Sequence, residues 1–443
     1  MIELSLAEVA RLAPGRLAAA PGADRVGGVE IDSRRVSPGD LFVAIRGGVA
    51  FVEAALAAGA AAAVVPDDPH AALAALGSAV RRRSRARIVA ITGSMGKTTT
   101  KDVLAALCRP HVETVAAEGS HNNEIGLPLT LTRLTPTSEI AVVEMGMRGL
   151  GQIAELCAIA EPDVAVITNV GPVHLELLGT MERIAQAKAE ILQGVRPGGT
   201  VIVPAGEPLL EAHLPADGVR VVRVGEGGDV SLRAFEPGSP NARLEVQAHG
   251  RTLELRLSVR SRHAALNALS AIAAYEALGL PLDRIGAGAA DVRLSRWRDE
   301  EIPLADGGLL LADCYNANPQ SIRAALAHLD SLAHGRRRVV VLGDMLELGP
   351  DAPSFHRQLG EEVVRTGAAV LVGVGELARH YLDGAERELR GASARPALDW
   401  APDADVARDR VRAHLAPGDA ILVKGSRGIR LETLVEAIAA GQE

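Results

Sequence analysis

One stretch decides the fold of this chain, residues 88–100, which reads Ile88-Val89-Ala90-Ile91-Thr92-Gly93-Ser94-Met95-Gly96-Lys97-Thr98-Thr99-Thr100. A β-branched apolar run stops at a glycine, and a helix-compatible run over residues 98–107 follows the lysine. This order of strand, loop and helix is typical of a phosphate site, in which backbone N–H groups and the helix N-terminus surround an oligophosphate. Residues 93–99 therefore predict a nucleotide site, with Lys97 on the outer phosphates and the Thr98 hydroxyl on Mg²⁺.

The match to the full phosphate-loop pattern is incomplete. That pattern has a glycine five residues before Gly96, where this chain has Ile91, so the match is the shorter Gly-x-x-Gly-Lys-Thr. An ordinary glycine turn before a helix is the alternative interpretation. The apolar strand that precedes the loop favours the nucleotide site.

Length and charge restrict the classes of protein to consider. A chain of 443 residues is too long for one ordinary core and indicates two or three domains. The net charge is −8 and no basic stripe extends beyond Arg81-Arg82-Arg83, so a nucleic-acid partner is not indicated. We interpret this arginine run, within a change of composition over residues 66–87, as a solvated linker at a domain boundary.

The cysteines and the apolar runs indicate the cellular compartment of the protein. The three cysteines, Cys108, Cys157 and Cys314, lie far apart without a C-x-x-C pair, which favours a reducing compartment and no structural zinc. Residues 1–20 lack a signal-peptide pattern, and the longest apolar run, residues 54–65, is too short to cross a bilayer. We expect a cytoplasmic protein that is not inserted in a membrane.

Lysine is scarce in this chain. Only four of the 47 basic residues are lysines, namely Lys97, Lys101, Lys188 and Lys424. Because arginine supplies the general surface charge, a lysine is a candidate for chemistry that a guanidinium cannot perform, such as compact phosphate binding or reaction as a primary amine. We expect functional roles for three of them and place Lys101 on the exposed side of its helix.

The order of elements predicts an α/β fold with three domains. Residues 1–85 read as a small N-terminal α/β module, and residues 86–297 alternate strands and helices around a mainly parallel sheet of the P-loop ATPase type. Residues 298–443 contain strands at 309–313, 338–342, 369–373 and 420–424, each followed by a helical stretch. This last segment predicts a Rossmann-like, doubly wound domain.

Polar residues follow two strands of the central segment. Glu144 ends the apolar strand 140–144, where a carboxylate beside a phosphate loop can bind Mg²⁺. His174 lies just beyond the strand 164–169, and Lys188 lies on a helix expected over 181–193. Ligands of open α/β sheets collect at the carboxyl ends of the strands, which favours functional over purely structural roles for these residues.

Three further motifs make the chain recognisable. They are Asp313-Cys314-Tyr315-Asn316-Ala317-Asn318-Pro319, Leu342-Gly343-Asp344-Met345-Leu346-Glu347-Leu348-Gly349 and Lys424-Gly425-Ser426-Arg427. With the phosphate loop, they resemble the Mur ligase family, ATP-dependent enzymes that add amino acids to a UDP-linked muramoyl peptide in bacterial cell-wall synthesis. The resemblance extends over nearly the whole chain. It is strongest to the branch that adds D-alanyl-D-alanine to UDP-N-acetylmuramoyl tripeptide through an acyl phosphate.

The resemblance implies a role for each candidate residue. Lys97, Lys188, His174 and Arg298 would be catalytic, with Arg298 (or, in another alignment, Arg296) on the γ-phosphate. Mg²⁺ would be held by Thr98, Glu144, His174 and Lys188, the last as a carbamate formed with CO₂. ATP would also contact Asn267, Asp313 and Asn316. The two other substrates would be held by Asp32, Ser33, Arg34, Asn122, Asn123, Asp344, Lys424 and Ser426, of which the first three lie on the UDP-sugar side.

Two alternatives remain at this point. One is another amide ligase of the same superfamily, of the folylpolyglutamate type. The other is a non-catalytic nucleotide-binding regulator that kept the scaffold, supported by Ala264 in place of the first Asn of the family's His-Asn-x-x-Asn pattern and by a shortened loop after Gly48. For the ligase we expect a monomer that needs ATP, Mg²⁺ and its two peptide substrates.

Overall fold

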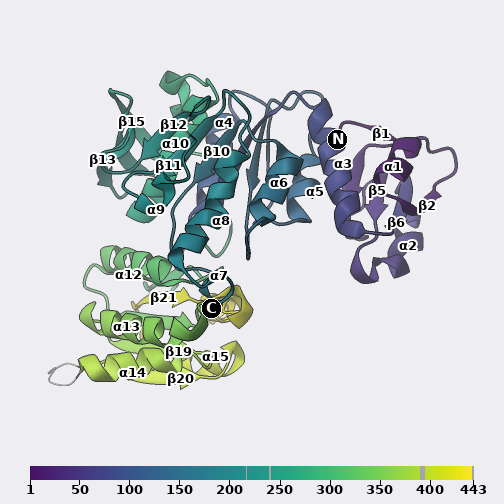
Figure 1. The fold of residues 1–443 in the computed structure, drawn as a ribbon. Coiled ribbons are helices and arrows are strands. Elements are labelled where there is room, and N and C mark those ends of the chain that lie inside the picture. The colour runs from purple at the N-terminus through teal and green to yellow at the C-terminus, as the bar shows by residue number, and fades with distance from the viewer. Residues whose placement is uncertain (216, 239–240, 390–394, 442–443) are drawn as a thin grey trace.

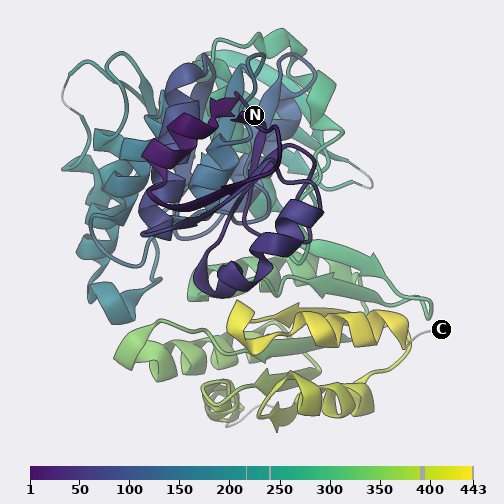
Figure 2. The same cartoon turned by 90° about the vertical axis from the view of Figure 1, so that its right-hand side faces the viewer.

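The computed structural model describes residues 1–215, 217–238, 241–389 and 395–441. Figure 1 shows a central α/β body with one smaller lobe at its N-terminal end and a second lobe beneath it, formed by the C-terminal part of the chain. Figure 2 shows, after a quarter turn, that the central body and the C-terminal lobe are stacked with the first lobe in front of them.

The N-terminal lobe is built on a four-stranded sheet of order β2-β6-β5-β4, with a separate antiparallel pair β1-β3. Its strands are β1 (Leu4–Ser5), β2 (Gly15–Ala19), β3 (Arg25–Val26), β4 (Gly28–Glu30), β5 (Asp40–Val43) and β6 (Ala62–Pro66). Its helices are α1 (Leu6–Leu12), α2 (Val52–Ala57) and α3 (Pro69–Arg83), with a short 3₁₀ segment at Arg46–Phe51. Ser5 forms a capping box with Glu8, which explains why α1 begins where it does.

Helix α3 occupies the stretch that the sequence suggested was a linker. That interpretation was wrong, because α3 packs against α5 (Gly126–Leu131) and α6 (Gln152–Ala160) of the central body and its apolar face joins their hydrophobic core. Arg81 is only 2 % exposed. Its guanidinium donates to the carbonyls of Ala160, at 2.7 Å, and Glu161, at 3.1 Å, so it satisfies the C-terminal end of α6.

We expect the Arg81→Met substitution to lower the free energy of unfolding by about 3 kcal/mol, because it leaves buried carbonyls without donors. Arg82→Met is the matched control, since the neighbouring Arg82 side chain is 66 % exposed. Denaturant unfolding of the two variants measures the difference. Equal stability of both variants would show that the buried hydrogen bonds of Arg81 do not hold the lobes together.

The central body contains a nine-stranded sheet of order β15-β14-β13-β12-β11-β10-β7-β9-β8. The seven strands from β13 to β8 run parallel, and the hairpin β14-β15 extends the sheet, with β14 antiparallel to both β13 and β15. The strands are β7 (Arg87–Thr92), β8 (Thr114–Ala116), β9 (Ile140–Glu144), β10 (Val164–Ile167), β11 (Thr200–Pro204), β12 (Arg220–Val224), β13 (Val230–Glu236), β14 (Ala242–Ala248) and β15 (Arg251–Leu257). β7, which leads into the phosphate loop, lies between β10 and β9, inside the sheet.

Helices cover both faces of this sheet. Besides α5 and α6, they are α4 (Lys97–Cys108), α7 (Leu175–Leu178), α8 (Met181–Gln193), α9 (Pro208–Glu211), α10 (Arg262–Ala277) and α11 (Gly286–Ala289). On one face α4 and α10 pack over buried Val, Ile and Leu side chains of the strands, and on the other α5, α6 and α8 form a core that continues into the N-terminal lobe.

The prediction that Lys101 is exposed was wrong. It is 2 % exposed and donates to the carbonyls of Ala117 and Gly119, both at 2.8 Å.

The C-terminal lobe has a six-stranded sheet of order β16-β17-β21-β18-β19-β20, in which only β16 is antiparallel. Its strands are β16 (Glu300–Pro303), β17 (Leu309–Ala312), β18 (Arg338–Gly343), β19 (Val370–Val374), β20 (Ala397–Ala401) and β21 (Ala420–Lys424). Its helices are α12 (Pro319–Ala333), α13 (Ala352–Arg365), α14 (Arg379–Glu388), α15 (Ala404–His414) and α16 (Glu432–Ala440). The predicted α/β class, with two mainly parallel sheets, is confirmed. Within the described residues, no helix has the length and apolarity needed to cross a bilayer.

Candidate active site

The phosphate loop is held in shape by its neighbours. The Asn169 side-chain oxygen accepts hydrogen bonds from the backbone N–H groups of Ser94 and Met95, both at 3.0 Å. Gly96 has φ of +81°, and a Cβ placed there would lie 2.2 Å from the Asn267 amide oxygen, so only glycine fits. α4 begins at the next residue, Lys97, and its first N–H groups point out of the helix end without intrahelical partners. This end suits an anion.

A hydroxyl and a carboxylate lie side by side next to the loop. The buried Thr98 hydroxyl donates to the Glu144 carboxylate at 2.8 Å, and the Asn122 amide donates to the other Glu144 oxygen at 2.8 Å. Hard oxygen donors of this kind fit Mg²⁺. No group of three or more His, Cys, Asp and Glu side chains in the described chain could hold a metal by itself, so Mg²⁺ here needs oxygens from substrate phosphates as well.

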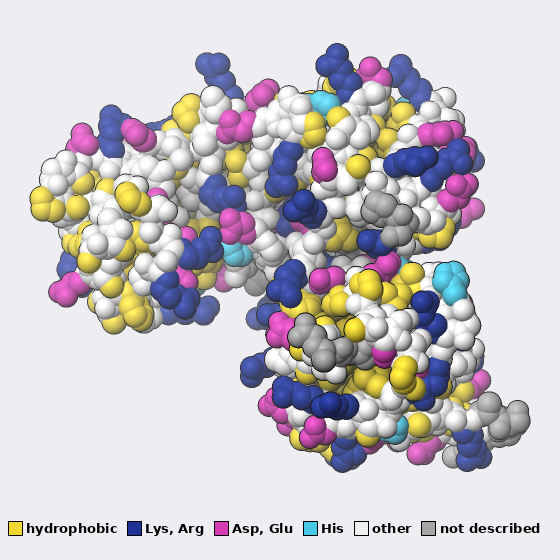
Figure 3. Space-filling model, turned by 180° about the vertical axis from the view of Figure 1, so that it is seen from behind, with side chains coloured by type: hydrophobic (Ala, Val, Ile, Leu, Met, Phe, Trp, Pro, Cys, Tyr) yellow, Lys and Arg dark blue, Asp and Glu magenta, His cyan; other side chains and the backbone are white. Residues whose placement is uncertain are grey.

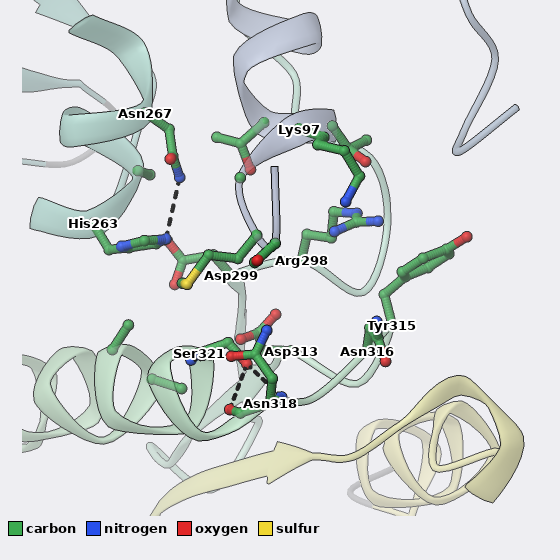
Figure 4. Close-up of a pocket in the computed structure, with 18 of the residues that line it drawn as sticks. Lys97, His263, Asn267, Arg298, Asp299, Asp313, Tyr315, Asn316, Asn318 and Ser321 are labelled. Atoms are coloured by element: carbon green, nitrogen blue, oxygen red, sulfur yellow. Dashed lines mark hydrogen bonds between the residues drawn. The ribbon is translucent and has the colours of Figure 1, made fainter. Parts of the chain in front are cut away.

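One cavity lies between the central body and the C-terminal lobe, and we call it the interdomain cavity. Figure 4 shows α4 and α10 above it and α12 below it, with Lys97 and Arg298 on one side and His263 and Asn267 on the other. Most of the predicted nucleotide residues line it, namely Ser94, Met95, Gly96, Lys97, Thr98, Thr99, Asn267, Arg298, Asp313 and Asn316, together with Asn122, Glu144 and Lys424. The geometry thus gathers the phosphate loop and the third domain's polar residues around one space.

A second and larger space, the substrate cleft, opens on the other side of the phosphate loop. It has a volume of about 730 Å³ and is lined by Gly93, Lys97, Asn122, Asn123, His174, Lys188 and Asn316, with parts of α3 and α6. From behind, Figure 3 shows a hollow between the N-terminal and C-terminal lobes with Lys and Arg side chains on its rim. Lys97, Asn122 and Asn316 line both spaces, so a group on one side can reach the other there.

Three central-body residues of the cleft, Lys97, Lys188 and His174, have shifted pKa values, and burial lowers the pKa of Lys97 below its ordinary value. Burial, and then the charge of Lys97, hold the pKa of Lys188 well below its ordinary value, and no carboxylate of the described chain offsets them. Burial also lowers the pKa of His174, although the Glu347 carboxylate opposes the shift. The His174 Nδ1 atom contacts that carboxylate, which arrives from the C-terminal lobe. The C-terminal lobe thus reaches the rim of the cleft through Glu347.

The remaining predicted substrate residues lie apart from these two spaces. Arg34, with its side chain 86 % exposed, pairs with Asp32 at 2.6 Å on the surface of the N-terminal lobe, and Ser33 lies between them in sequence. Asp344 and Ser426 are buried inside the C-terminal lobe, where the Asp344 carboxylate accepts from the Ala378 N–H at 2.7 Å and Ser426 accepts from the Leu346 N–H at 3.0 Å. They shape the loops of that lobe and line neither space.

Several lining residues were missed from the sequence. They are His263, Asp299, Tyr315, Asn318 and Ser321. Tyr315 and Asn318 belong to the recognised motif 313–319, so that motif could have indicated them. The Tyr315 ring lies 4.0 Å from the Arg298 guanidinium carbon and so holds this arginine toward the cavity. No sequence motif indicated Asp299, because its hydrogen-bond partners, Ser261 and His328, lie far from it in the sequence.

The pKa of His328, on α12, is set by its contacts with two carboxylates, Asp299 and Glu301. The His328 side chain is 2 % exposed, and its Nδ1 donates to Asp299 at 2.5 Å. Burial alone would lower the pKa of His328, but the hydrogen bond to Asp299 and the contact with Glu301 outweigh it and raise the pKa to about 9.

We therefore expect His328 to make stability depend on pH. Because its folded pKa exceeds the unfolded value of 6.5, its contribution of about 3 kcal/mol is complete below pH 6.5 and is lost as pH rises through 9. Unfolding of the wild type and of His328→Asn at about pH 6 and about pH 9.5 measures this. The difference in the free energy of unfolding between the wild type and His328→Asn should disappear at the higher pH. A gap that stays constant would contradict a protonated His328.

The comparisons with known proteins agree with this geometry. Models of the Mur ligase family match three parts of the chain, namely the family's catalytic domain over residues 25–111, its middle domain over residues 91–275 and its glutamate ligase domain over residues 297–427. The UDP-N-acetylmuramoyl-tripeptide--D-alanyl-D-alanine ligase of Mycobacterium tuberculosis is 37% identical, with 99% of this chain and 98% of that protein covered. The chain belongs to the Mur ligase family. The family predicted from its motifs is confirmed.

Solved structures extend this similarity to the fold. The crystal structure of MurF from Acinetobacter baumannii matches this Mur ligase with a TM-score of 0.84 and 29% identity, covering 99% of both chains. MurF ligase from Thermotoga maritima, solved in complex with ADP, matches with a TM-score of 0.79 and 27% identity, covering 93% of this chain and 97% of that one. This Mur ligase therefore has the three-part α/β architecture of those enzymes.

Proposed function

We propose that this Mur ligase joins D-alanyl-D-alanine to UDP-N-acetylmuramoyl tripeptide and converts ATP to ADP and phosphate. One observation carries the proposal. Lys97, at the tip of the phosphate loop, lies at the point where the interdomain cavity meets the substrate cleft. A nucleotide in the first space would thus present its terminal phosphate to a carboxylate in the second. The names of the relatives supply the identity of the two peptide substrates.

The chemistry requires activation of the carboxylate, since a carboxylate is a poor electrophile and amide formation in water is uphill. The terminal carboxylate oxygen of the tripeptide attacks the γ-phosphorus of ATP, ADP leaves, and an acyl phosphate forms. The free amine of the dipeptide then attacks the acyl carbon, the C–O bond breaks, and phosphate leaves with the amide formed. Charge gathers on the transferring oxygens in the first step, and Lys97 and Arg298, which both line the interdomain cavity, would offset it.

Mg²⁺, bound to Thr98 and Glu144 and to the phosphates, would neutralise part of the same charge. His174 would contribute from the cleft once it leaves Glu347. Lys188 would contribute as a carbamate, because its buried amine can add to CO₂ and become an anion that helps to hold Mg²⁺, whereas a guanidinium cannot. Asn122 supports the site by holding Glu144 in place.

The substrates would occupy different lobes. Asp32, Ser33 and Arg34 would contact the UDP-sugar, and Asn123 would face the peptide in the cleft, which it lines. The dipeptide would approach from the C-terminal lobe, with Lys424, Asp344 and Ser426 fixing the surface that receives it. Closure of the lobes would keep water away from the acyl phosphate. We propose that the enzyme acts as a monomer, because the candidate site as described needs no residue from a second chain, and that the reaction takes place in the cytoplasm, because its UDP-linked substrate is soluble.

The proposal is tested by phosphate release from ATP in the presence of UDP-N-acetylmuramoyl tripeptide, with and without D-alanyl-D-alanine. We expect sustained phosphate release only with both peptides, and an amide product in equal amount. Release that depends on a folate and glutamate instead would assign the chain to the folylpolyglutamate type. Nucleotide binding without any synthesis would assign it to the regulator on the same scaffold.

A further inference from the structure

A group of buried and half-buried polar side chains lies at the junction between the central body and the C-terminal lobe. It consists of His328 on α12, two carboxylates, Asp299 and Glu301, and two residues just before α10, Arg260 and Ser261. We call it the hinge cluster. Ser261 and Asp299 line the interdomain cavity, and Arg260, Glu301 and His328 do not. The hydrogen bonds and ion pairs that join the cluster do not include the phosphate loop.

The hinge cluster has His328 at its centre. Its Nδ1 atom donates to one Asp299 oxygen at 2.5 Å, and its Nε2 atom lies 3.2 Å from a Glu301 oxygen. Each carboxylate then uses its other oxygen for the central body. The Ser261 hydroxyl donates to Asp299 at 2.5 Å, and Arg260 lies 3.3 Å from Glu301. Two carboxylates with one imidazolium between them thus join α12 to the residues that precede α10.

Ser261 is the N-cap of α10. Its hydroxyl oxygen accepts a hydrogen bond from the Ala264 N–H at 3.0 Å while its hydrogen goes to Asp299. The first turns of α10 carry His263 and Asn267, which line the interdomain cavity and are joined by a hydrogen bond of 3.2 Å (Figure 4). Asp299 therefore holds Ser261, the N-cap of α10, through a hydrogen bond, and the N-terminal end of α10 forms one wall of the cavity.

His328 belongs to the helix that forms the facing wall. α12 begins at Pro319, and Asn318 and Ser321 at its N-terminal end line the same cavity. Asp299 has φ of +54° and Trp297 has φ of +63°, so the connection between the lobes holds two side chains in the left-handed region. Such backbone persists only where surrounding contacts fix it, and the hinge cluster supplies these contacts.

We propose that Asp299 and His328 are positioning residues for the nucleotide, which fix the wall of the cavity on α10 against the wall on α12. The inference rests on the proposed function, because it assumes that ATP or ADP occupies the interdomain cavity. Asp299 itself lines the cavity, whereas His328 does not and would act on nucleotide affinity only through Asp299. Charged hydrogen bonds of this kind contribute enough to change affinity by about tenfold or more when one partner is removed.

The test measures the dissociation constants of the full chain for ADP and for UDP-N-acetylmuramoyl tripeptide by calorimetry. We expect His328→Leu and the isosteric Asp299→Asn to raise the Kd for ADP about tenfold or more. They should leave the Kd for the tripeptide unchanged, since no residue of the hinge cluster lines the substrate cleft proposed for the tripeptide. His328→Asn retains a donor near the Nδ1 position and should recover part of the affinity. The double variant, with both His328→Leu and Asp299→Asn, should have the same Kd for ADP as whichever single variant binds ADP more weakly, because each substitution alone already breaks the His328–Asp299 interaction.

His380→Leu is the matched control. His380 lies on helix α14 of the same lobe and pairs with Asp383 at 2.9 Å. The substitution removes a histidine–aspartate pair that does not line the cavity, and it should leave the Kd for ADP and the Kd for the tripeptide unchanged. Folding of each variant is checked by thermal unfolding without ligand. Wild-type affinity for ADP in folded Asp299→Asn or His328→Leu would overturn the inference while the ligase proposal stands. Equal weakening for both ligands would also overturn it, and absence of ADP binding by the wild type would overturn both.

Discussion

The Lys97→Met substitution should reduce formation of the acyl phosphate by about a thousandfold or more. Lys97 is the only lysine that lines both the interdomain cavity and the substrate cleft in the described chain, and in the absence of a nucleotide its ammonium donates to the Gly93 carbonyl at 2.7 Å. Methionine keeps the length and the apolar stem but removes the charge from the transferring oxygens. Trapping of the acyl phosphate by hydroxylamine, with ATP and the tripeptide but no dipeptide, isolates this step.

Arg109→Met provides the matched control for Lys97. Arg109 is exposed at the opposite end of α4, so the substitution removes one positive charge from the same helix far from the loop. We expect it to form the hydroxamate at the wild-type rate. If Lys97→Met also forms hydroxamate at that rate, Lys97 does not stabilise the transferring phosphate and its proposed role is wrong.

The Lys188→Ala substitution should abolish ligation almost as completely, and short carboxylates such as formate should restore part of it. The Lys188 side chain is among the largest that are fully buried, and the pKa of its amine is held low by burial and by Lys97, which favours the neutral amine that adds CO₂. Alanine leaves a cavity in which a free carboxylate can take the place of the carbamate. Ligation measured against formate concentration at saturating Mg²⁺ gives the extent of rescue.

Two further results bear on Lys188. The Lys188→Arg variant should stay inactive with or without formate, because arginine forms no carbamate and fills the space that the carboxylate needs. With ¹³CO₂, the wild type should give a carbamate carbon signal in NMR spectra that Lys188→Ala lacks. Failure of formate to rescue Lys188→Ala, together with a wild type that gives no carbamate signal, would refute the carbamate.

Local pattern made much of the fold predictable. The strands β9 and β21 and the helix α8 have the bounds that the sequence suggested, because runs of buried β-branched residues and a helical period are properties of the chain over a few residues. The phosphate loop was recognisable for the same reason, since glycine spacing and the lysine that follows are local. The Mur ligase family followed from the phosphate loop together with three motifs of four to eight residues.

Exposure of long cationic side chains was not predictable in this way. Arg81 and Lys101 both read as surface residues, and both are buried. Their acceptors are backbone carbonyls distant in sequence, Ala160 for Arg81 and Ala117 for Lys101, which no periodicity of the helix around either residue indicates. Burial of a charge depends on what packs against it, and here the packing partners come from other elements.

The sequence by itself determined the α/β class, the phosphate loop and the family, because each is written in short runs of residues. Only the tertiary structure decided that the cavity for the nucleotide is shared between the central body and the C-terminal lobe, that Glu347 reaches His174, and that His328 joins Asp299 and Glu301. These contacts depend on how two lobes are oriented, and that orientation is set by the combined packing of residues far apart in the chain rather than by any one segment.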